Sequence, residues 1–371
     1  MKIAVMLRTL EIDQGISIYS INLMKSVLKL DRENEYLFLY ADPSRIGTFG
    51  SYPNLREEVL PTKSKLIWDQ VSVPRAARRF GADIIFNTKF SVPLLSRAKS
   101  MLVLHGSEWY VHPEFYSKLD MIYNKILFPV YCGRASAISS VSQTSATDII
   151  EFLKLDPAKV HVVHSSIAEH FHANVDQATK TACKEKYALP DNFVLFVGKI
   201  YPGKNFGNIV RAFKKISDSA EDDIRLVSVG DMRWRFKSEI QLVNELGLAE
   251  KVYFPGWIEQ EDLPAIYSLA DCFLFPSFYE GFGIPLLEAM ACDCPVVTAN
   301  TGSCPEIAAN AALYADPNDP DEIADQVLKV LRDTDLRQDL LRLGRERVKD
   351  FSWDRAGRMT INIFKEICAA D

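Results

Sequence analysis

With 371 residues, the chain is longer than one hydrophobic core usually accommodates, which predicts two domains of similar size. Hydrophobic residues make up 48% and charged residues 25%, as in ordinary globular proteins. The net charge of -6 argues against a protein that binds nucleic acid through bulk positive charge, so any bound anion must be held by local groups.

Cysteine usage and the apolar runs predict a reduced, cytoplasmic protein. The seven cysteines are scattered, and the opening MKIAVMLRTLE has too short an apolar run for a signal peptide. No run reaches the roughly 18 apolar residues that would span a bilayer. Cys292, Cys294 and Cys304 lie close together, but no nearby histidine or fourth cysteine completes a zinc set. We therefore expect buried thiols, no metal and no cofactor.

Short β-rich apolar runs alternate with helix-period stretches along the chain. In the first half, strands are predicted at 2–7, 35–40, 82–86, 100–105, 135–142 and 160–165, with a helix over 16–29. In the second half, strands are predicted at 193–199, 224–230, 252–256, 272–277 and 295–299. This alternation predicts parallel sheets covered on both faces, and hence an α/β protein with two doubly wound, Rossmann-like domains.

The polar segment 173–186 lacks strand character and is interpreted as a linker. It separates an N-terminal domain over 1–172 from a C-terminal domain over 187–350. Residues 351–371 have the pattern of a last amphipathic helix.

Three positions in the first half are candidates for ligand contact. Gly15 lies between the first strand and its helix, where a helix N-terminus can meet a diphosphate or an acceptor. His105 ends a strand and is followed by Trp109 and Tyr110, and polar groups beside aromatic rings suit a sugar. A histidine at a strand end is also commonly structural.

A basic helical face follows Pro74. Arg75, Arg78 and Arg79 share this face and could rest on anionic lipid headgroups at the inner side of the plasma membrane. The alternative interpretation is a solvated basic surface.

Four strands of the second half run directly into polar loops, which begin at 199, 231, 257 and 277. Their convergence on one sheet edge predicts a single pocket. The first loop, VGKIYPGKN over 197–205, carries Lys199 and Lys204, whose ammonium groups suit a diphosphate. Its spacing is not that of a P-loop. Two solvated lysines are the alternative.

The stretch EGFGIPLLEAM, which begins at Glu280, places glycines and carboxylates at the start of an apolar helix. Gly281 and Gly283 allow tight turns and close approach of a ligand, and the following backbone N–H groups can bind an anion. Glu288, one turn inside the helix, suits the hydroxyls of a sugar diol, and Glu280 suits a second polyol. The alternative is an acidic helix start on a solvated surface.

Taken together, these segments resemble the large retaining glycosyltransferase family four, which has the GT-B fold of two Rossmann-like domains facing a central cleft. The similarity covers nearly the whole chain and is densest over 193–331. FPSFYEGFGIPLLEAMACDCPVVTANTGSCPEIA resembles the family's hallmark segment, and VGKIYPGKN resembles its phosphate loop, with Lys199 in the place of the usual arginine.

The resemblance implies an acceptor-binding first domain, a nucleotide-sugar-binding second domain, and a last helix that crosses back to the first. Glu288 would hold the ribose, Glu280 the donor sugar, and Lys199 and Lys204 the leaving diphosphate without a metal. The remaining donor contacts would come from His105, Gly15, and residues 281–284, namely Gly281, Phe282, Gly283 and Ile284; Trp109 and Tyr110 would contact the acceptor.

The implied activity is transfer of a hexose from a nucleoside diphosphate sugar to a hydroxyl of a saccharide or lipid-linked acceptor, in polysaccharide or glycoconjugate synthesis. The anomeric configuration would be retained. UDP-glucose-like donors are favoured and GDP-mannose-like donors also fit. Two alternatives stay open: a nucleotide-sugar epimerase or hydrolase, and a non-catalytic subunit that binds a sugar nucleotide.

Overall fold

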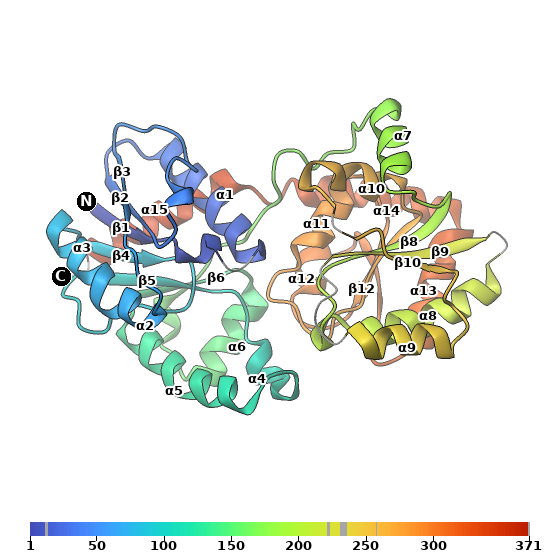
Figure 1. The fold of residues 1–371 in the computed structure, drawn as a ribbon, viewed down its shortest axis with the longest axis horizontal. Helices are drawn as coiled ribbons and strands as arrows, with labels where there is room; N and C mark the ends of the chain where they lie inside the picture. Colours follow the sequence, from blue (N-terminus) through green and yellow to red (C-terminus); the bar gives the residue numbers. More distant parts are fainter. Residues whose placement is uncertain (12–13, 221–222, 231–235, 257, 370–371) are drawn as a thin grey trace. The chain divides into compact units, whose positions relative to one another are not determined.

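The computed structural model describes residues 1–11, 14–220, 223–230, 236–256 and 258–369. The chain divides into two compact units, unit 1 with Met1–Ser165 and Ser352–Asp371, and unit 2 with Ser166–Phe351. Each unit is built on one parallel β-sheet with helices packed against it, as labelled in Figure 1. The predicted pair of Rossmann-like domains is confirmed.

The sheet of unit 1 has the strand order β3-β2-β1-β4-β5-β6-β7, and the neighbouring strands are parallel. Residues in its centre, such as Val5, Phe86 and Leu102, have no exposed surface, because helices cover both faces. The strands are β1 (Lys2–Met6), β2 (Glu35–Tyr40), β3 (Leu55–Val59), β4 (Ile84–Asn87), β5 (Lys99–Leu104), β6 (Ala137–Ser140) and β7 (Val160–Val162).

The helices of unit 1 include one from the end of the chain. α15 packs along α1 (Figure 1), where Lys29 forms a 3.0 Å ion pair with Asp354. A Cβ at Gly357 would lie 2.5 Å from the Ser26 hydroxyl, so the two helices approach closely at this glycine. The helices are α1 (Gln14–Leu30), α2 (Lys65–Ile67), α3 (Val73–Phe80), α4 (Glu108–Val111), α5 (Lys118–Arg134), α6 (Gln143–Leu153) and α15 (Trp353–Ala369).

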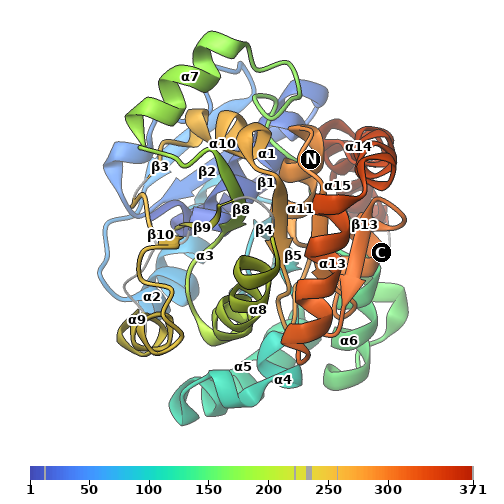
Figure 2. The same ribbon diagram turned by 90° about the vertical axis from the view of Figure 1, so that its right-hand side faces the viewer.

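The sheet of unit 2 has the order β10-β9-β8-β11-β12-β13, again with parallel neighbours. The strands are β8 (Asn192–Val197), β9 (Ile224–Val229), β10 (Val252–Tyr253), β11 (Cys272–Phe275), β12 (Val296–Ala299) and β13 (Ala312–Ala315). The helices are α7 (Gln177–Lys186), α8 (Phe206–Ser219), α9 (Phe236–Glu245), α10 (Leu263–Leu269), α11 (Ile284–Ala291), α12 (Cys304–Ala308), α13 (Pro320–Arg332) and α14 (Thr334–Val348). Figure 2 shows α8 and α13 side by side, joined by an ion pair of 2.8 Å between Lys215 and Asp325.

Two strands, β3 and β13, were not predicted from the sequence, and both lie at sheet edges. β3 reads LREEV and has an exposed Arg56, because an edge strand can be solvated on one side. β13 reads ALYA and follows an alanine-rich stretch that favours helix. Each strand therefore lacks the long apolar run that reveals a central strand.

The segment 173–186 differs from the expected linker. Most of it forms α7, whose N-cap Asp176 accepts a 2.8 Å hydrogen bond from the Thr179 amide. Cys183 is buried, and α7 packs against α10 within unit 2. The boundary between the units falls instead at Ser165–Ser166 and again at Phe351–Ser352. A capped helix with only one buried position resembles a polar linker in composition.

Gly230 should tolerate no side chain. Its φ is +142°, and a Cβ there would lie 2.2 Å from the carbonyl oxygen of Gly198. Gly230→Ala should therefore destabilise unit 2 by about 3 kcal/mol and lower its melting temperature by about 6–12 °C, measured by differential scanning calorimetry.

Gly247 provides the matched control. Its φ of +71° also favours glycine, but no atom lies within 4 Å of the position that a Cβ would take. Gly247→Ala should cost about 1 kcal/mol and shift the melting temperature by about 2–4 °C. Equal shifts in the two variants would contradict the importance of the close approach between Gly230 and Gly198.

Candidate active site

The strand order of unit 2 reverses between β8 and β11, which are neighbours in the sheet. Parallel strands present their carboxyl ends at one edge, and ligands of doubly wound sheets bind at such a reversal. The loop after β8 carries Lys199 and Lys204, and the loop after β11 carries Glu280. The fold therefore brings two predicted loops to one place within unit 2.

Asn205 fastens these loops to each other. It is buried in a left-handed conformation with a φ of 60°. Its side-chain amide donates hydrogen bonds to the carbonyl oxygens of Pro276, at 3.0 Å, and Pro317, at 2.6 Å. The amide of Phe278 also donates to the carbonyl oxygen of Gly203, at 2.9 Å. The backbone beside Lys204 is thus fixed against the end of β11.

Lys204 and Glu280 form an ion pair through Nζ and Oε1. Only 17% of the lysine side chain and 11% of the glutamate side chain are exposed. The ammonium also lies 4.8 Å from the centre of the Phe275 ring. Since water screens this pair little, a cation and a carboxylate are held at defined positions at the sheet edge. Lys199 differs, because its side chain is exposed to solvent.

A third loop, residues 301–303 after β12, packs against the backbone of Glu280. The sequence analysis did not identify this role. A Cβ at Gly302, whose φ is +57°, would lie 2.9 Å from the Glu280 nitrogen. The amide of Ser303 donates to the Glu280 carbonyl oxygen at 3.2 Å, and the Thr301 hydroxyl donates to that of Phe278 at 3.0 Å. The signal available in the sequence was the turn NTGS, residues 300–303, directly after the predicted strand 295–299.

The turn between Glu280 and α11 requires glycine at Gly283, whose backbone is left-handed. Gly283 is the N-cap of α11 and has a φ of 86°. Phe282 is buried, with its ring 5.6 Å from that of Phe351, so its side chain serves packing. Gly281 and Ile284 are partly exposed. Ligand contact by the amides of residues 282–284 stays a prediction.

Glu288 lies in α11 and is partly buried. The hydroxyl of Tyr267, a fully buried residue of α10, donates a 2.9 Å hydrogen bond to Oε2 of Glu288. Burial raises the pKa of Glu288 to about 7, although the Tyr267 hydrogen bond acts in the opposite direction. Tyr267 was absent from the predicted site. It orients the carboxylate and occupies one of its two oxygens.

In unit 1, His105 follows β5 and is partly buried. Its Nε2 lies 2.8 Å from the carbonyl oxygen of Thr88, so this nitrogen carries a proton and donates it. Its ring also meets that of Tyr19 edge to face at 4.7 Å. Thr88 follows β4, which neighbours β1 at the strand-order reversal of unit 1. Gly15 lies in the first turn of α1 and is exposed.

The predicted aromatic pair serves mainly as core. Trp109 is 7% exposed and packs against Tyr110 and Phe128, with ring centres at 4.0 and 4.2 Å. Tyr110 is partly buried and stacks on Phe152 at 5.2 Å. Little of the Trp109 ring is left for a ligand, and acceptor binding by this pair stays a prediction.

The basic face of α3 is exposed at Arg75, Arg78 and Arg79. Arg79 forms an ion pair with Glu58. Its charge is therefore partly neutralised, and contact of this face with a membrane stays a prediction. Among the described residues, no helix is long and apolar enough to cross a bilayer.

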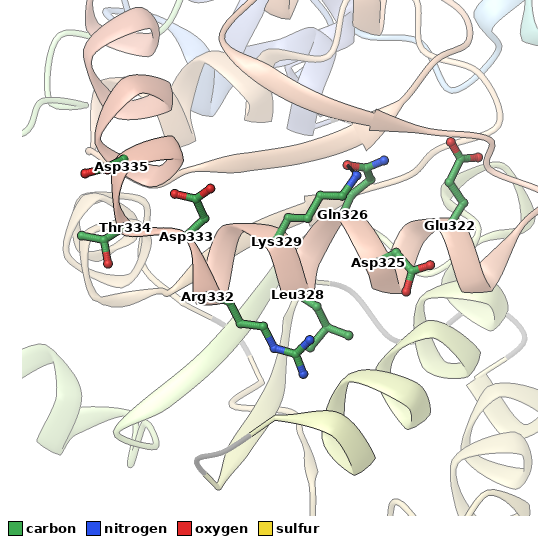
Figure 3. Close-up of a pocket in the computed structure, with 9 residues that line it drawn as sticks. All are labelled: Glu322, Asp325, Gln326, Leu328, Lys329, Arg332, Asp333, Thr334 and Asp335. Carbon is green, nitrogen blue, oxygen red and sulfur yellow. Dashed lines mark hydrogen bonds between the residues drawn. The ribbon is translucent and has the colours of Figure 1, made fainter.

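A surface hollow lies apart from all predicted residues. Side chains of α13 and the start of α14 line it, including Asp325, Lys329 and Arg332 (Figure 3). Acidic and basic groups alternate there, as on an ordinary solvated helix surface.

The chain matches known sequences over nearly its full length. The profile of the family described as Glycosyl transferases group 1 matches residues 179–347, and that of Glycosyltransferase Family 4 matches residues 36–169. The chain is 30% identical to O-antigen chain mannosyltransferase B of Escherichia coli over 95% of its own length and 96% of the relative's. It is 29% identical to the serotype-specific mannosyltransferase WbdA of Escherichia coli, over 63% of this chain and 29% of that longer protein.

Solved structures share the architecture. Sucrose-phosphate synthase of Thermosynechococcus elongatus superposes with a TM-score of 0.80 at 19% identity, covering 100% of both chains. Anabaena HepE in complex with UDP-glucose gives a TM-score of 0.79 at 18% identity, covering 99% of this chain and 100% of that one.

The two parallel sheets and these neighbours define the GT-B fold class of glycosyltransferases. More particularly, the chain belongs to the glycosyl transferases group 1 family and is a glycosyltransferase. The family resemblance predicted from the sequence is confirmed.

The raised pKa of Glu288 predicts a pH-dependent stability. The folded protein binds this proton more tightly than the unfolded chain, so the contribution to stability is complete below about pH 4.5 and is lost as the pH rises through about 7. Glu288→Gln should therefore gain stability relative to the unchanged protein as the pH increases from 5 to 8, by at most about 3 kcal/mol. Melting temperatures measured at each pH give this difference.

Tyr267→Phe tests the cause of the shift. Loss of the hydroxyl removes a hydrogen bond to the charged carboxylate, so the transition assigned to Glu288 should move to higher pH. Each variant shares its other titrating groups with its parent, so their contributions cancel in the difference in melting temperature between the two proteins. A pH-independent difference between Glu288→Gln and its parent would contradict the raised pKa.

Proposed function

We propose that this protein transfers a hexose, with retention of configuration and without a metal, from a nucleoside diphosphate sugar to a hydroxyl of a saccharide or lipid-linked acceptor. The observation that carries the proposal is the buried pair of Lys204 and Glu280, placed with Glu288 at the strand-order reversal of unit 2. The family provides the reaction class, and these residues supply the groups that the reaction requires.

The lysines and the helix start would stabilise the leaving group. Cleavage of the anomeric C–O bond leaves negative charge on the departing diphosphate, and fixed cations and N–H groups favour that charge. Lys204 is held in place, whereas the exposed Lys199 must become ordered when the donor binds. The diphosphate would share Lys204 with Glu280 and loosen the pair, so that Glu280 can accept hydrogen bonds from the sugar.

Retention follows from a front-face route. The acceptor oxygen forms its bond to the anomeric carbon on the side that the diphosphate leaves, and the acceptor proton passes to the departing phosphate oxygen. This route requires no protein base. Glu288 would bind the ribose hydroxyls through the carboxylate oxygen that Tyr267 does not occupy.

The donor that we propose is GDP-mannose-like, with a UDP-glucose-like donor as the second candidate. The sequence analysis favoured the second. Two relatives, at 30% and 29% identity, are named as mannosyltransferases, whereas the UDP-glucose complex belongs to a protein of 18% identity that shares the fold. The name of the first relative, O-antigen chain mannosyltransferase B, supports a growing polysaccharide as the acceptor.

The donor should be distinguishable by thermal shift. A ligand at about 100 times its dissociation constant stabilises the protein by about 2.7 kcal/mol. We expect this stabilisation with GDP and GDP-mannose and a smaller one with UDP and UDP-glucose. Glu288→Ala should lose the shift, because the ribose hydroxyls lose their acceptor. A full shift in this variant would contradict the role of Glu288.

Transfer should depend on the buried ion pair. We expect Glu280→Ala and Lys204→Ala to reduce the transfer rate by about 100-fold or more, because each removes a group that acts on the reacting donor. Glu280→Ala should affect binding of the bare nucleotide least. The measurement is the formation of extended acceptor from labelled nucleotide sugar.

The exposed pair of Lys349 and Glu346, at 67% and 64% exposure, gives matched control variants that should retain full activity. Conversion of the nucleotide sugar without any acceptor would favour the epimerase or hydrolase alternative. An unchanged transfer rate in both buried-pair variants would contradict the assigned roles.

A further inference from the structure

The structure exposes an apolar stripe on α5. Leu119, Ile122, Tyr123, Ile126 and Val130 have 79, 56, 41, 60 and 45% of their surface exposed. Their spacings of three and four residues place them on one face of the helix. Isolated exposed apolar residues are common, but five on one helix face are not.

The opposite face of α5 explains why this stripe points outward. Met121, Phe128, Tyr131 and Cys132 are buried in the core of unit 1, where they pack with Trp109 and other residues. The helix is thus anchored by one apolar face and presents a second one. A helix that only covers a core needs a single apolar face.

The stripe continues onto the neighbouring segment. Leu95 is 93% exposed, and Arg134 at the end of α5 donates a 3.3 Å hydrogen bond to the carbonyl oxygen of the adjacent Leu94. The α5 surface is defined here as the stripe of α5 together with Leu95. Figure 1 shows α5 running along the outside of unit 1.

Basic residues border the α5 surface. Lys118 and Lys125 are exposed on α5, and Arg97 is exposed beside Leu95. Along α5, acidic character is limited to Asp120 in the first turn, which receives a 2.7 Å hydrogen bond from Ser117. A local excess of positive charge on a chain of net charge -6 favours an anionic partner.

We propose that the α5 surface binds the interfacial region of an anionic lipid bilayer, independently of the donor chemistry proposed above. α5 would lie in the membrane plane, with its isoleucines at the boundary between headgroups and acyl chains and its lysines at lipid phosphates. A second copy of the chain is a poorer occupant. Pairing two α5 surfaces would bring the basic residues of both copies together, which disfavours a dimer.

Vesicle flotation of the full chain tests the proposal. Vesicles of phosphatidylglycerol and phosphatidylcholine should bind the protein, and vesicles of phosphatidylcholine alone should bind it at least tenfold more weakly. Ile122→Glu combined with Ile126→Glu should reduce binding by tenfold or more. Lys118→Glu and Lys125→Glu should each reduce binding to anionic vesicles by about fivefold.

Ile46, which is 47% exposed in another part of unit 1, is the matched control, and Ile46→Glu should bind vesicles like the unchanged protein. The melting temperature of each variant should stay unchanged, because the substituted side chains are exposed. Two outcomes would overturn the proposal. In the first, the double variant binds vesicles as well as the unchanged protein does. In the second, the unchanged protein does not bind vesicles but forms a dimer, and the double variant is a monomer.

Discussion

The hydrogen bonds of the Asn205 side chain hold the candidate site together. They tie the loop after β8 to the carbonyl oxygens of Pro276 and Pro317, so that Lys204 meets Glu280 in a partly buried ion pair. Without such connections, two loops far apart in sequence would have to be ordered when the donor binds, at a cost in conformational entropy. The buried Asn205 amide, the Phe278–Gly203 backbone hydrogen bond and the support by Ser303 together preorganise this cation and carboxylate.

The sequence predicted the central strands and the two sheets because buried parallel strands are continuous apolar runs. It also predicted that Lys204 and Glu280 lie near each other, because carboxyl ends of parallel strands share an edge, and their ion pair confirms this. A single pocket that also includes Glu288 stays a prediction. It could not predict the Tyr267 hydrogen bond or the support by Thr301–Ser303. Both are contacts between elements that follow different strands, and they carry no local pattern.

The misread features have a common physical origin. The segment 173–186 is mostly polar because α7 buries little more than Cys183, and β3 is polar because it lies at a sheet edge. The packing of the Trp109 ring against Phe128 of α5 was likewise not evident from the sequence, whereas acceptor contact by Trp109 stays a prediction. The composition of a segment indicates how much of it is buried, but it does not indicate which other element the segment packs against.

The packing of α15 on α1 has a consequence for biosynthesis. The residues that complete unit 1 leave the ribosome after unit 2, while the helix they cover leaves before it. Unit 2 lies between these two segments in the chain and can fold as soon as it emerges. The N-terminal segment of unit 1 is completed only when α15 is synthesised, and until then the side of α1 that carries Ser26 is uncovered. Such an intermediate exposes apolar surface during translation, and this surface stays exposed until α15 packs on α1.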